Sequence, residues 1–210
     1  MIVAIDGPAG AGKSTVARAL AERLGFRYLD TGAMYRALTW LAMKRGVDLS
    51  DADALARLAH AEPVRFDDSG RVWVAGTDVT SSIRDQRIDR MVPVVARHPA
   101  VREVMRDRQR ELGHEGDVVI EGRDIGTVVV PDAEVKVYLV ADREERARRR
   151  TADRPGIGAD ALATDLKTRD EKDAERMQPA ADAHEIDTTS LRVEDVVGRI
   201  EALVRERSAV

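Results

Sequence analysis

The feature that most constrains the fold is a glycine-rich stretch at residues 7–15, which reads Gly-Pro-Ala-Gly-Ala-Gly-Lys-Ser-Thr. An apolar run at 2–5 precedes it. After it, Val16, Leu20 and Leu24 recur every four residues, as they would on one face of a helix. Glycines let successive backbone N–H groups point inward without a Cβ clash, and the N-terminus of a following helix adds partial positive charge. The spacing Gly-x4-Gly-Lys-Ser therefore predicts a strand, a phosphate-binding loop and a helix, in that order.

Two side chains of this loop carry specific chemistry. Lys13 supplies a full positive charge for the outer phosphates of a nucleoside triphosphate, and the Ser14 hydroxyl is placed to bind Mg²⁺. Glu121 ends a later apolar run, and we expect it to bind the same Mg²⁺ through water; its alternative role is a capping or salt-bridge carboxylate. The residues expected to hold the triphosphate are Gly7, Gly10, Ala11, Gly12, Lys13, Ser14 and Thr15.

The composition favours one α/β domain with insertions. Of the 210 residues, 43% are apolar, which is enough for a core, and no cysteine is present to form disulfides or to bind zinc. No apolar run approaches the ~20 residues of a membrane span, and no signal-peptide pattern opens the chain, so we expect a cytoplasmic protein without a membrane partner. The net charge of −4 argues against a nucleic-acid partner. Only five of the 34 basic residues are lysines, and arginine favours polyanionic small substrates.

Short apolar runs alternate with amphipathic segments along the chain. This order is typical of a parallel sheet with helices on both faces. Two stretches depart from it. Residues 63–82 contain short β-rich runs separated by turn signals, which predict a small antiparallel insert. Residues 148–160 combine glycine and proline with flanking arginines and are expected to form a loop. The strands of the main sheet are expected near 2–5, 26–29, 118–120, 135–140 and 185–187.

The absence of some motifs narrows the reaction. No guanine-reading Asn-Lys-x-Asp and no protein-kinase catalytic-loop signature is present, which leaves a small-molecule kinase. A phosphate acceptor has a second pKa near ~6 and is already an anionic nucleophile at neutral pH, so it needs positive charge but no general base. The many arginines fit this requirement, and the four histidines are interpreted as structural or surface residues. Two alternatives stay open here: an alcohol acceptor with Asp30 as its base, and an NTP-binding switch.

A carboxylate near an arginine would recognise cytosine by hydrogen bonds and discriminate against uracil. Cytosine presents an amino donor at N4 and acceptors at N3 and O2, which a carboxylate and an arginine would match. Uracil reverses the pattern at N3 and N4, so the same pair would be mismatched. Asp124 would therefore select cytosine if an arginine converges on the same base.

Several segments resemble bacterial cytidylate kinases. They are the loop at 7–15, Asp-Thr-Gly-Ala-Met-Tyr-Arg at 30–36, Glu-Gly-Arg-Asp-Ile-Gly-Thr-Val-Val-Val-Pro-Asp-Ala at 121–133, and Arg-Asp-x-x-Asp-x-x-Arg at 169–176. The block at 121–133 distinguishes this family from adenylate and shikimate kinases. The resemblance implies transfer of the ATP γ-phosphoryl group to CMP or dCMP, with Mg²⁺, by a monomeric enzyme of pyrimidine nucleotide metabolism.

The resemblance also implies an architecture and a site. The fold would be a three-layer P-loop fold with a central five-stranded parallel sheet. Its core would comprise 1–30, 100–147 and 161–210, with a nucleoside-monophosphate (NMP) lobe at 31–99 and a lid at 148–160. The implied substrate contacts are Thr31, Arg102 and Asp124 for the cytosine, Arg36, Arg123 and Arg176 for the acceptor phosphate, Arg169 and Asp173 for the sugar, and Tyr35 beside them. Lys13, Arg123 and Arg176 would stabilise the transition state, and arginines within 146–154 would reach the donor phosphates.

One position departs from the family pattern. The family often has a serine six residues before the proline of a Pro-x-Val-Arg segment, whereas this chain has Pro93 before Pro99. Proline offers no hydroxyl and removes a helix hydrogen bond. One contact to the nucleoside is therefore expected to be missing, and the preference between CMP and dCMP is expected to shift.

Overall fold

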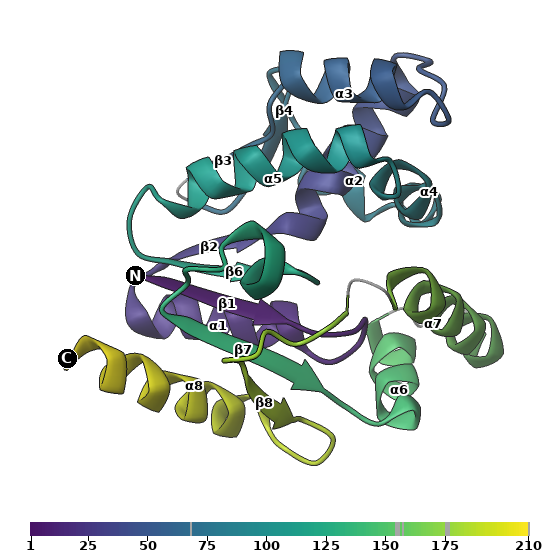
Figure 1. The fold of residues 1–210 in the computed structure, drawn as a ribbon. Helices are drawn as coiled ribbons and strands as arrows, with labels where there is room; N and C mark the ends of the chain where they lie inside the picture. The colour runs from purple at the N-terminus through teal and green to yellow at the C-terminus, as the bar shows by residue number, and fades with distance from the viewer. Residues whose placement is uncertain (68, 154–155, 157, 175–176, 210) are drawn as a thin grey trace. The chain divides into compact units, whose positions relative to one another are not determined.

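The structure is a computed structural model that describes residues 1–67, 69–153, 156, 158–174 and 177–209 (Figure 1). The chain divides into two compact units. The first comprises residues 1–28 and 116–210, and the second comprises residues 29–115. Each unit is described by itself.

A five-stranded sheet organises the first unit, and only the last two residues of its strand β2, 29–30, are counted with the second unit. Its strands are β1 (Ile2–Asp6), β2 (Arg27–Asp30), β6 (Val118–Glu121), β7 (Val135–Val140) and β8 (His184–Asp187), in the spatial order β2-β6-β1-β7-β8. β1 pairs in parallel with β6 and β7, and β7 pairs in parallel with β8. Every residue of the central strand β1 is buried, which explains its apolar run. The α/β class with a five-stranded parallel sheet, predicted from the sequence, is confirmed.

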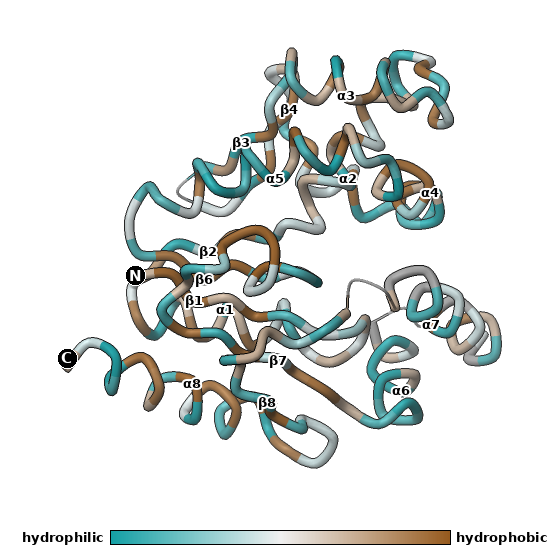
Figure 2. Tube along the Cα trace, in the orientation of Figure 1, coloured by the Kyte–Doolittle hydropathy of each residue, from teal (hydrophilic) through white to brown (hydrophobic). Residues whose placement is uncertain are grey.

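Two helices bury their apolar faces with this sheet. α1 (Lys13–Leu24) and α8 (Val193–Ser208) pack against each other, and their buried residues join those of β1 and β7 in one hydrophobic core. In Figure 2, α8 alternates between brown and teal along its length, as expected of a helix with one buried face. The remaining helical elements of this unit are η2 (Ile125–Val129), α6 (Arg143–Asp153) and α7 (Ala159–Asp173).

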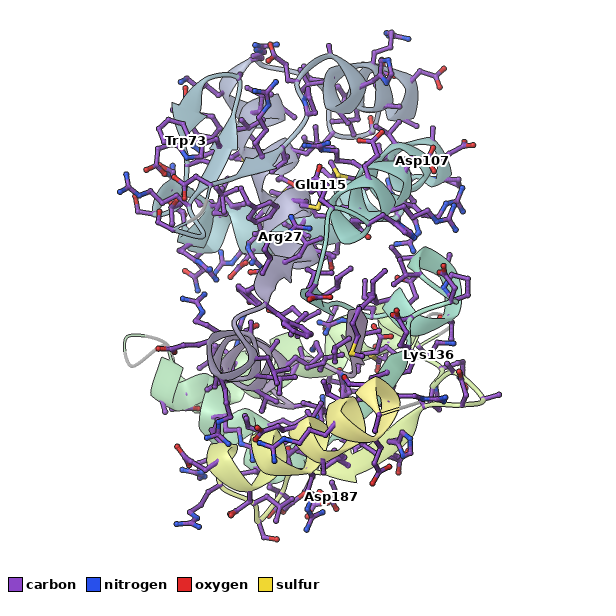
Figure 3. All side chains as sticks on the ribbon, turned by 90° about the vertical axis from the view of Figure 1, so that its left-hand side faces the viewer. Arg27, Trp73, Asp107, Glu115, Lys136 and Asp187 are labelled. Carbon is purple, nitrogen blue, oxygen red and sulfur yellow. The ribbon has the colours of Figure 1, made fainter. Side chains whose placement is uncertain are left out.

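The second unit is mainly helical and carries the expected insert. Its helices are α2 (Thr31–Lys44), α3 (Ala52–Ala61), η1 (Ser82–Arg84), α4 (Gln86–Ala96) and α5 (Pro99–Gly113). The strands β3 (Arg65–Phe66), β4 (Val72–Val74) and β5 (Thr77–Asp78) form an antiparallel three-stranded sheet. Both tryptophans of the chain, Trp40 and Trp73, lie in this unit, and Trp73 is labelled on the insert in Figure 3.

Some expected boundaries differ from the observed ones. The resemblance assigns residues from 100 onward to the core, whereas α5 packs against α3 and lies in the second unit. Pro93 lies inside α4, and the helix continues through it. The expected loop at 148–160 is partly helical, because α6 continues to Asp153 and α7 begins at Ala159. Among the described residues, no helix is both long and apolar enough to cross a membrane.

Candidate functional site

The loop between β1 and α1 needs glycine at two positions where its main chain lies close to other parts of the protein. Gly7 has φ 144°, and a Cβ there would lie 2.2 Å from the carbonyl oxygen of Leu139. Gly10 has φ 79°, and its Cβ would lie 3.0 Å from the Cβ of Arg146. Both positions combine a backbone conformation that side chains disfavour with a lack of space. The main chain of the loop is therefore held close to β7 and α6.

The positive charges of the loop gather at the start of α1. No described side chain caps this helix, so the N–H groups of its first turn are donors suited to an anion. The Lys13 side chain is buried, and its Nζ donates to the carbonyl oxygen of Pro8 at 2.8 Å. The ammonium group thus lies within the loop. This geometry suits the phosphate cradle that the motif predicts, and phosphate binding by these residues stays a prediction.

Ser14 lies beside the carboxylate that we expected to share a magnesium ion with it. Its Oγ donates to Oε2 of Glu121 at 2.9 Å, and the Tyr28 hydroxyl donates to Oε1 of Glu121. Glu121 is 3% exposed. A hydroxyl and one carboxylate fit Mg²⁺, which commonly keeps several waters and substrate phosphates as its other ligands. No group of three or more His, Cys, Asp or Glu is arranged to hold a metal ion among the residues that the structure describes.

The last two residues of β1 and the glycine that follows them hold the segment 122–126. The carbonyl oxygen of Ile5 accepts from the Gly122 N–H at 3.0 Å. The two carboxylate oxygens of Asp6 accept from the N–H groups of Ile125 at 2.9 Å and Gly126 at 2.8 Å. The Gly7 carbonyl oxygen accepts from Nη1 of Arg123 at 2.8 Å. The segment that carries Arg123 and Asp124 is therefore fixed directly to the strand that leads into the phosphate loop.

Asp6 has a perturbed acidity. Burial raises the pKa of the Asp6 carboxyl from 3.8 to about 6, and the negative charge of Asp124 contributes to the rise. The hydrogen bonds from the Gly126 and Ile125 N–H groups and the positive charge of Lys13 act in the opposite direction and lower the pKa. Asp6 is therefore mostly ionised at pH 7, and both of its oxygens can accept hydrogen bonds.

Two arginines of α6 support the phosphate loop, one by a direct hydrogen bond and one through Thr188. Nη1 of Arg146 donates to the Ala9 carbonyl at 3.1 Å, and its two terminal nitrogens bind the carboxylate of Asp170 on α7 at 3.1 and 2.7 Å. Arg149 donates to the hydroxyl of Thr188 at 3.0 Å and to its carbonyl oxygen at 2.6 Å. The same hydroxyl donates to the Ala11 carbonyl at 3.1 Å. These arginines, expected to reach donor phosphates, have protein partners in this structure.

In the second unit, Asp30 is committed to structural partners. Its Oδ1 accepts from the Ala33 N–H at 2.8 Å, which caps α2, and its Oδ2 accepts from Nη2 of Arg36 at 2.7 Å. Arg84 lies 3.8 Å from the same oxygen. A carboxylate bound on both oxygens is a poor general base, so this geometry argues against an alcohol acceptor activated by Asp30.

The predicted site residues fall into three groups. The first unit brings together the phosphate loop, Glu121, Arg123 and Asp124. Thr31, Tyr35, Arg36 and Arg102 belong to the second unit. Arg176 lies outside the described residues, and the side chains of Arg169 and Asp173 on α7 are likewise not among those described. The roles of these residues toward substrate stay predictions.

The second unit also contains a surface pocket of about 720 Å³. Trp40, Lys44, Ser82, Arg84 and Arg87 are among its lining residues, and none of the predicted site residues lines it.

No role was predicted from the sequence for Asp6, Tyr28 or Thr188. Only Asp6 had a visible signal, because it is a charged residue that ends an otherwise apolar strand directly before the glycine loop. Thr188 contacts the loop across 177 residues of chain, and Tyr28 reaches Glu121 across 93. Pairs so far apart leave no spacing pattern in a single sequence.

The fold and the site together define a class of protein. A glycine-rich cradle between the first parallel strand and its helix, with a lysine inside it and a serine–carboxylate pair beside it, is the site of a P-loop kinase. The solved structure of shikimate kinase from Bacteroides thetaiotaomicron has this fold, with a TM-score of 0.54 and 15% identity over 98% of each chain. At that identity the likeness concerns the fold alone.

Comparison with proteins of similar sequence identifies the family within this class. The family model "Cytidylate kinase" matches residues 3–206. Cytidylate kinase from Anoxybacillus flavithermus is 50% identical over 98% of this chain and 96% of its own length. Cytidylate kinase from Bacillus subtilis is 46% identical over 98% of this chain and 97% of its own. The chain belongs to the cytidylate kinase family.

Proposed function

We propose that this chain transfers the γ-phosphoryl group of ATP to CMP and dCMP, in the presence of Mg²⁺. Membership of the cytidylate kinase family carries the proposal. The loop at 7–15 supports the donor half, because it supplies backbone donors and Lys13 for a triphosphate. The fixed position of Arg123 beside Gly7 supports the acceptor half, because it holds a guanidinium group next to the donor loop.

The chemistry that we propose relies on position and charge. The acceptor phosphate is already a nucleophile at neutral pH, so the protein aligns it with the donor, neutralises the charge and excludes water. Lys13 and Arg123 lower the repulsion between the two anions, and Arg36 and Arg176 complete the proposed acceptor-phosphate site. Ser14 and Glu121 would hold Mg²⁺, which supplies further neutralisation of the phosphate oxygens when bound.

The base is proposed to be read by Asp124, Arg102 and Thr31. Asp124 is 8% exposed, so a mismatched base would leave a buried polar group without its partner. This is the reason to expect cytosine to be preferred over uracil. The sugar is proposed to contact Arg169 and Asp173, and Tyr35 lies in the first turns of α2 beside Arg36.

An assay of ADP release tests the proposal. Acceptors would be CMP, dCMP, UMP and AMP, with an acceptor-free control. We expect CMP and dCMP to be used far better than UMP or AMP, and turnover without acceptor to be negligible. Acceptor-independent turnover would instead favour an NTP-binding switch, and equal use of UMP would contradict the proposed base recognition.

Pro93 gives a test of sugar preference. It lies inside α4, where the family often has a serine, and a serine would restore a hydroxyl and a backbone donor. We expect Pro93→Ser to change the ratio of kcat/KM for CMP to that for dCMP. An unchanged ratio would show that this position does not contact the nucleoside.

A further inference from the structure

A buried carboxylate ends β1 without a role in the proposed chemistry. Asp6 is 6% exposed and follows four apolar residues of the same strand. Burying an ionised carboxylate is strongly unfavourable unless hydrogen bonds compensate for the lost water. A phosphate acceptor needs no general base, so proton transfer does not explain this residue.

The partners of Asp6 are two consecutive backbone donors. One carboxylate oxygen accepts from Ile125 at 2.9 Å and the other from Gly126 at 2.8 Å. An ionised carboxylate offers acceptors on both oxygens, whereas an amide of the same shape offers one acceptor and one donor. The pair of N–H groups therefore requires a carboxylate at this position.

These two donors directly follow Arg123 and Asp124. On the other side of that pair, Gly122 donates to Ile5, and Arg123 itself donates to Gly7. After the pair, the Asp124 carbonyl oxygen accepts from the N–H groups of Val128 at 2.9 Å and Val129 at 3.1 Å in the turn η2. Asp124 is thus held from both sides, and the Asp6 carboxylate anchors the side that leads into η2.

Close packing leaves this segment little room to shift. A Cβ added at Gly126 would lie 3.2 Å from Cδ of Lys136 and 3.5 Å from Oδ2 of Asp6. Lys136, labelled in Figure 3, is itself fixed by Asp182 at 2.9 Å and by the Pro131 carbonyl. The two Asp6 bonds and the close approach of Lys136 together restrain this backbone, so loss of one Asp6 bond would remove part of the restraint on the backbone that carries Arg123 and Asp124.

We propose that Asp6 is a positioning residue for acceptor recognition, whose carboxylate sets the backbone from Arg123 to Gly126 and so aims the Arg123 and Asp124 side chains. The inference rests on the proposed function, in which those two side chains contact CMP. Asp6 itself touches no substrate. Discrimination between cytosine and uracil thus depends on a residue of the strand that leads into the donor loop.

Asp6→Asn tests this inference. The amide can accept only one of the two N–H groups and turns a donor toward the other. We expect the KM for CMP to rise at least about tenfold, and the ratio of kcat/KM for CMP to that for UMP to fall at least about tenfold. Affinity for ADP should change less than about threefold, because the hydrogen bonds that the structure describes for the Asp6 carboxylate come from Ile125 and Gly126 and not from the loop at 7–15. A general loss of structure would lower both affinities alike.

Asp51→Asn is the matched control. Asp51 also accepts a backbone N–H, from Ala54 at 2.9 Å, but one acceptor is enough there and asparagine is an equally good helix cap. This variant should keep the wild-type ratio. A folded Asp6→Asn variant that also keeps it would overturn the inference.

Amide hydrogen exchange of the unmodified chain gives a test that does not depend on the variant folding. The Ile125 and Gly126 amides should exchange as slowly as those of β6, and fast exchange of both would overturn the inference. Failure of the proposed function is a separate result: the wild-type chain would then use UMP as readily as CMP, whatever the exchange of these two amides.

Discussion

The Lys13 ammonium group is held in place before any phosphate binds. Its Nζ lies 2.8 Å from the Pro8 carbonyl oxygen, and the residue is 7% exposed. The ammonium group is thus already desolvated within the loop, where a fixed charge acts more strongly than in water.

Replacing this charge should affect catalysis far more than folding. We expect Lys13→Ala to lower kcat by about 10²–10³-fold, the range for loss of one preorganised electrostatic group. One lost hydrogen bond alters stability by only about 1 kcal/mol, so the thermal unfolding curve should change little. Lys167→Ala, at an exposed position on α7, serves as the control. Activity within a few-fold of wild type would contradict the role of Lys13 in phosphate binding.

Tyr28 gives a residue-scale prediction about the proposed magnesium site. Its hydroxyl holds one oxygen of Glu121 while Ser14 binds the other. Tyr28→Phe keeps the ring beneath Arg18, 5.2 Å from the guanidinium carbon. Since groups that orient a metal-binding carboxylate contribute to metal affinity, the Mg²⁺ concentration needed to promote ADP binding should rise about tenfold.

This effect would be measured by calorimetric titration of ADP at several Mg²⁺ concentrations. ADP affinity without Mg²⁺ should stay unchanged. Tyr138→Phe is the control, because it also removes a tyrosine hydroxyl, one that donates to the Met177 carbonyl at 3.0 Å. An equal shift in both variants would show that Tyr28 has no particular relation to Glu121.

At the scale of elements, α6 connects the phosphate loop with α7. Arg146 joins α6 to α7 through Asp170 and to the phosphate loop through Ala9. Its side chain is 10% exposed, whereas that of Arg148 on the same helix is 72% exposed. Two arginines two residues apart therefore differ greatly in their expected contribution.

Arg146→Ala should lower the free energy of unfolding by about 2–4 kcal/mol, because it leaves the Asp170 carboxylate and the Ala9 carbonyl without their donor. In a chain of this length, each kcal/mol corresponds to about 2–4 °C in Tm. Arg148→Ala should leave Tm unchanged within error. Thermal unfolding followed by circular dichroism distinguishes the two variants, and equal shifts would contradict the bracing role of Arg146.

The helices and strands could be predicted from the sequence more fully than the contacts between residues far apart in the chain. Every strand of the main sheet and the antiparallel insert followed from apolar runs and turn signals, because those patterns are local. The π-type turn η2 was not predicted, since it depends on the Asp124 carbonyl and on the buried Asp6. The loop at 7–15 was likewise visible in sequence, whereas its support by Arg146 and Thr188 comes from residues brought close only by the fold.

At the scale of the whole molecule, Asp6 links stability to pH. Its pKa is raised from 3.8 to about 6, so between these values the folded state binds more protons than the unfolded state. The contribution of Asp6 to the free energy of unfolding therefore falls as pH rises from about 4 to about 6, by up to about 3 kcal/mol, and is constant above that range. Asp124, Lys13 and Tyr138 are the charged or titratable groups that interact with it.

Urea denaturation of wild type and Asp6→Asn across this pH range isolates the effect. Carboxylates with lowered pKa, such as Asp67 and Glu145, act in the opposite direction but are common to both chains. We expect the difference in unfolding free energy, wild type minus variant, to decrease between about pH 4 and pH 6 and then to level off. Parallel pH curves would contradict this linkage.

The placement of the two tryptophans makes the units separable by spectroscopy. Trp40 and Trp73 both lie in residues 29–115, so selective excitation of tryptophan reports on that unit alone. The chain contains no cysteine, so one introduced cysteine in the first unit would be a unique labelling position. Energy transfer from the native tryptophans to a dye at that position would measure the distance between the two units with and without nucleotides, and no native residue would have to be removed.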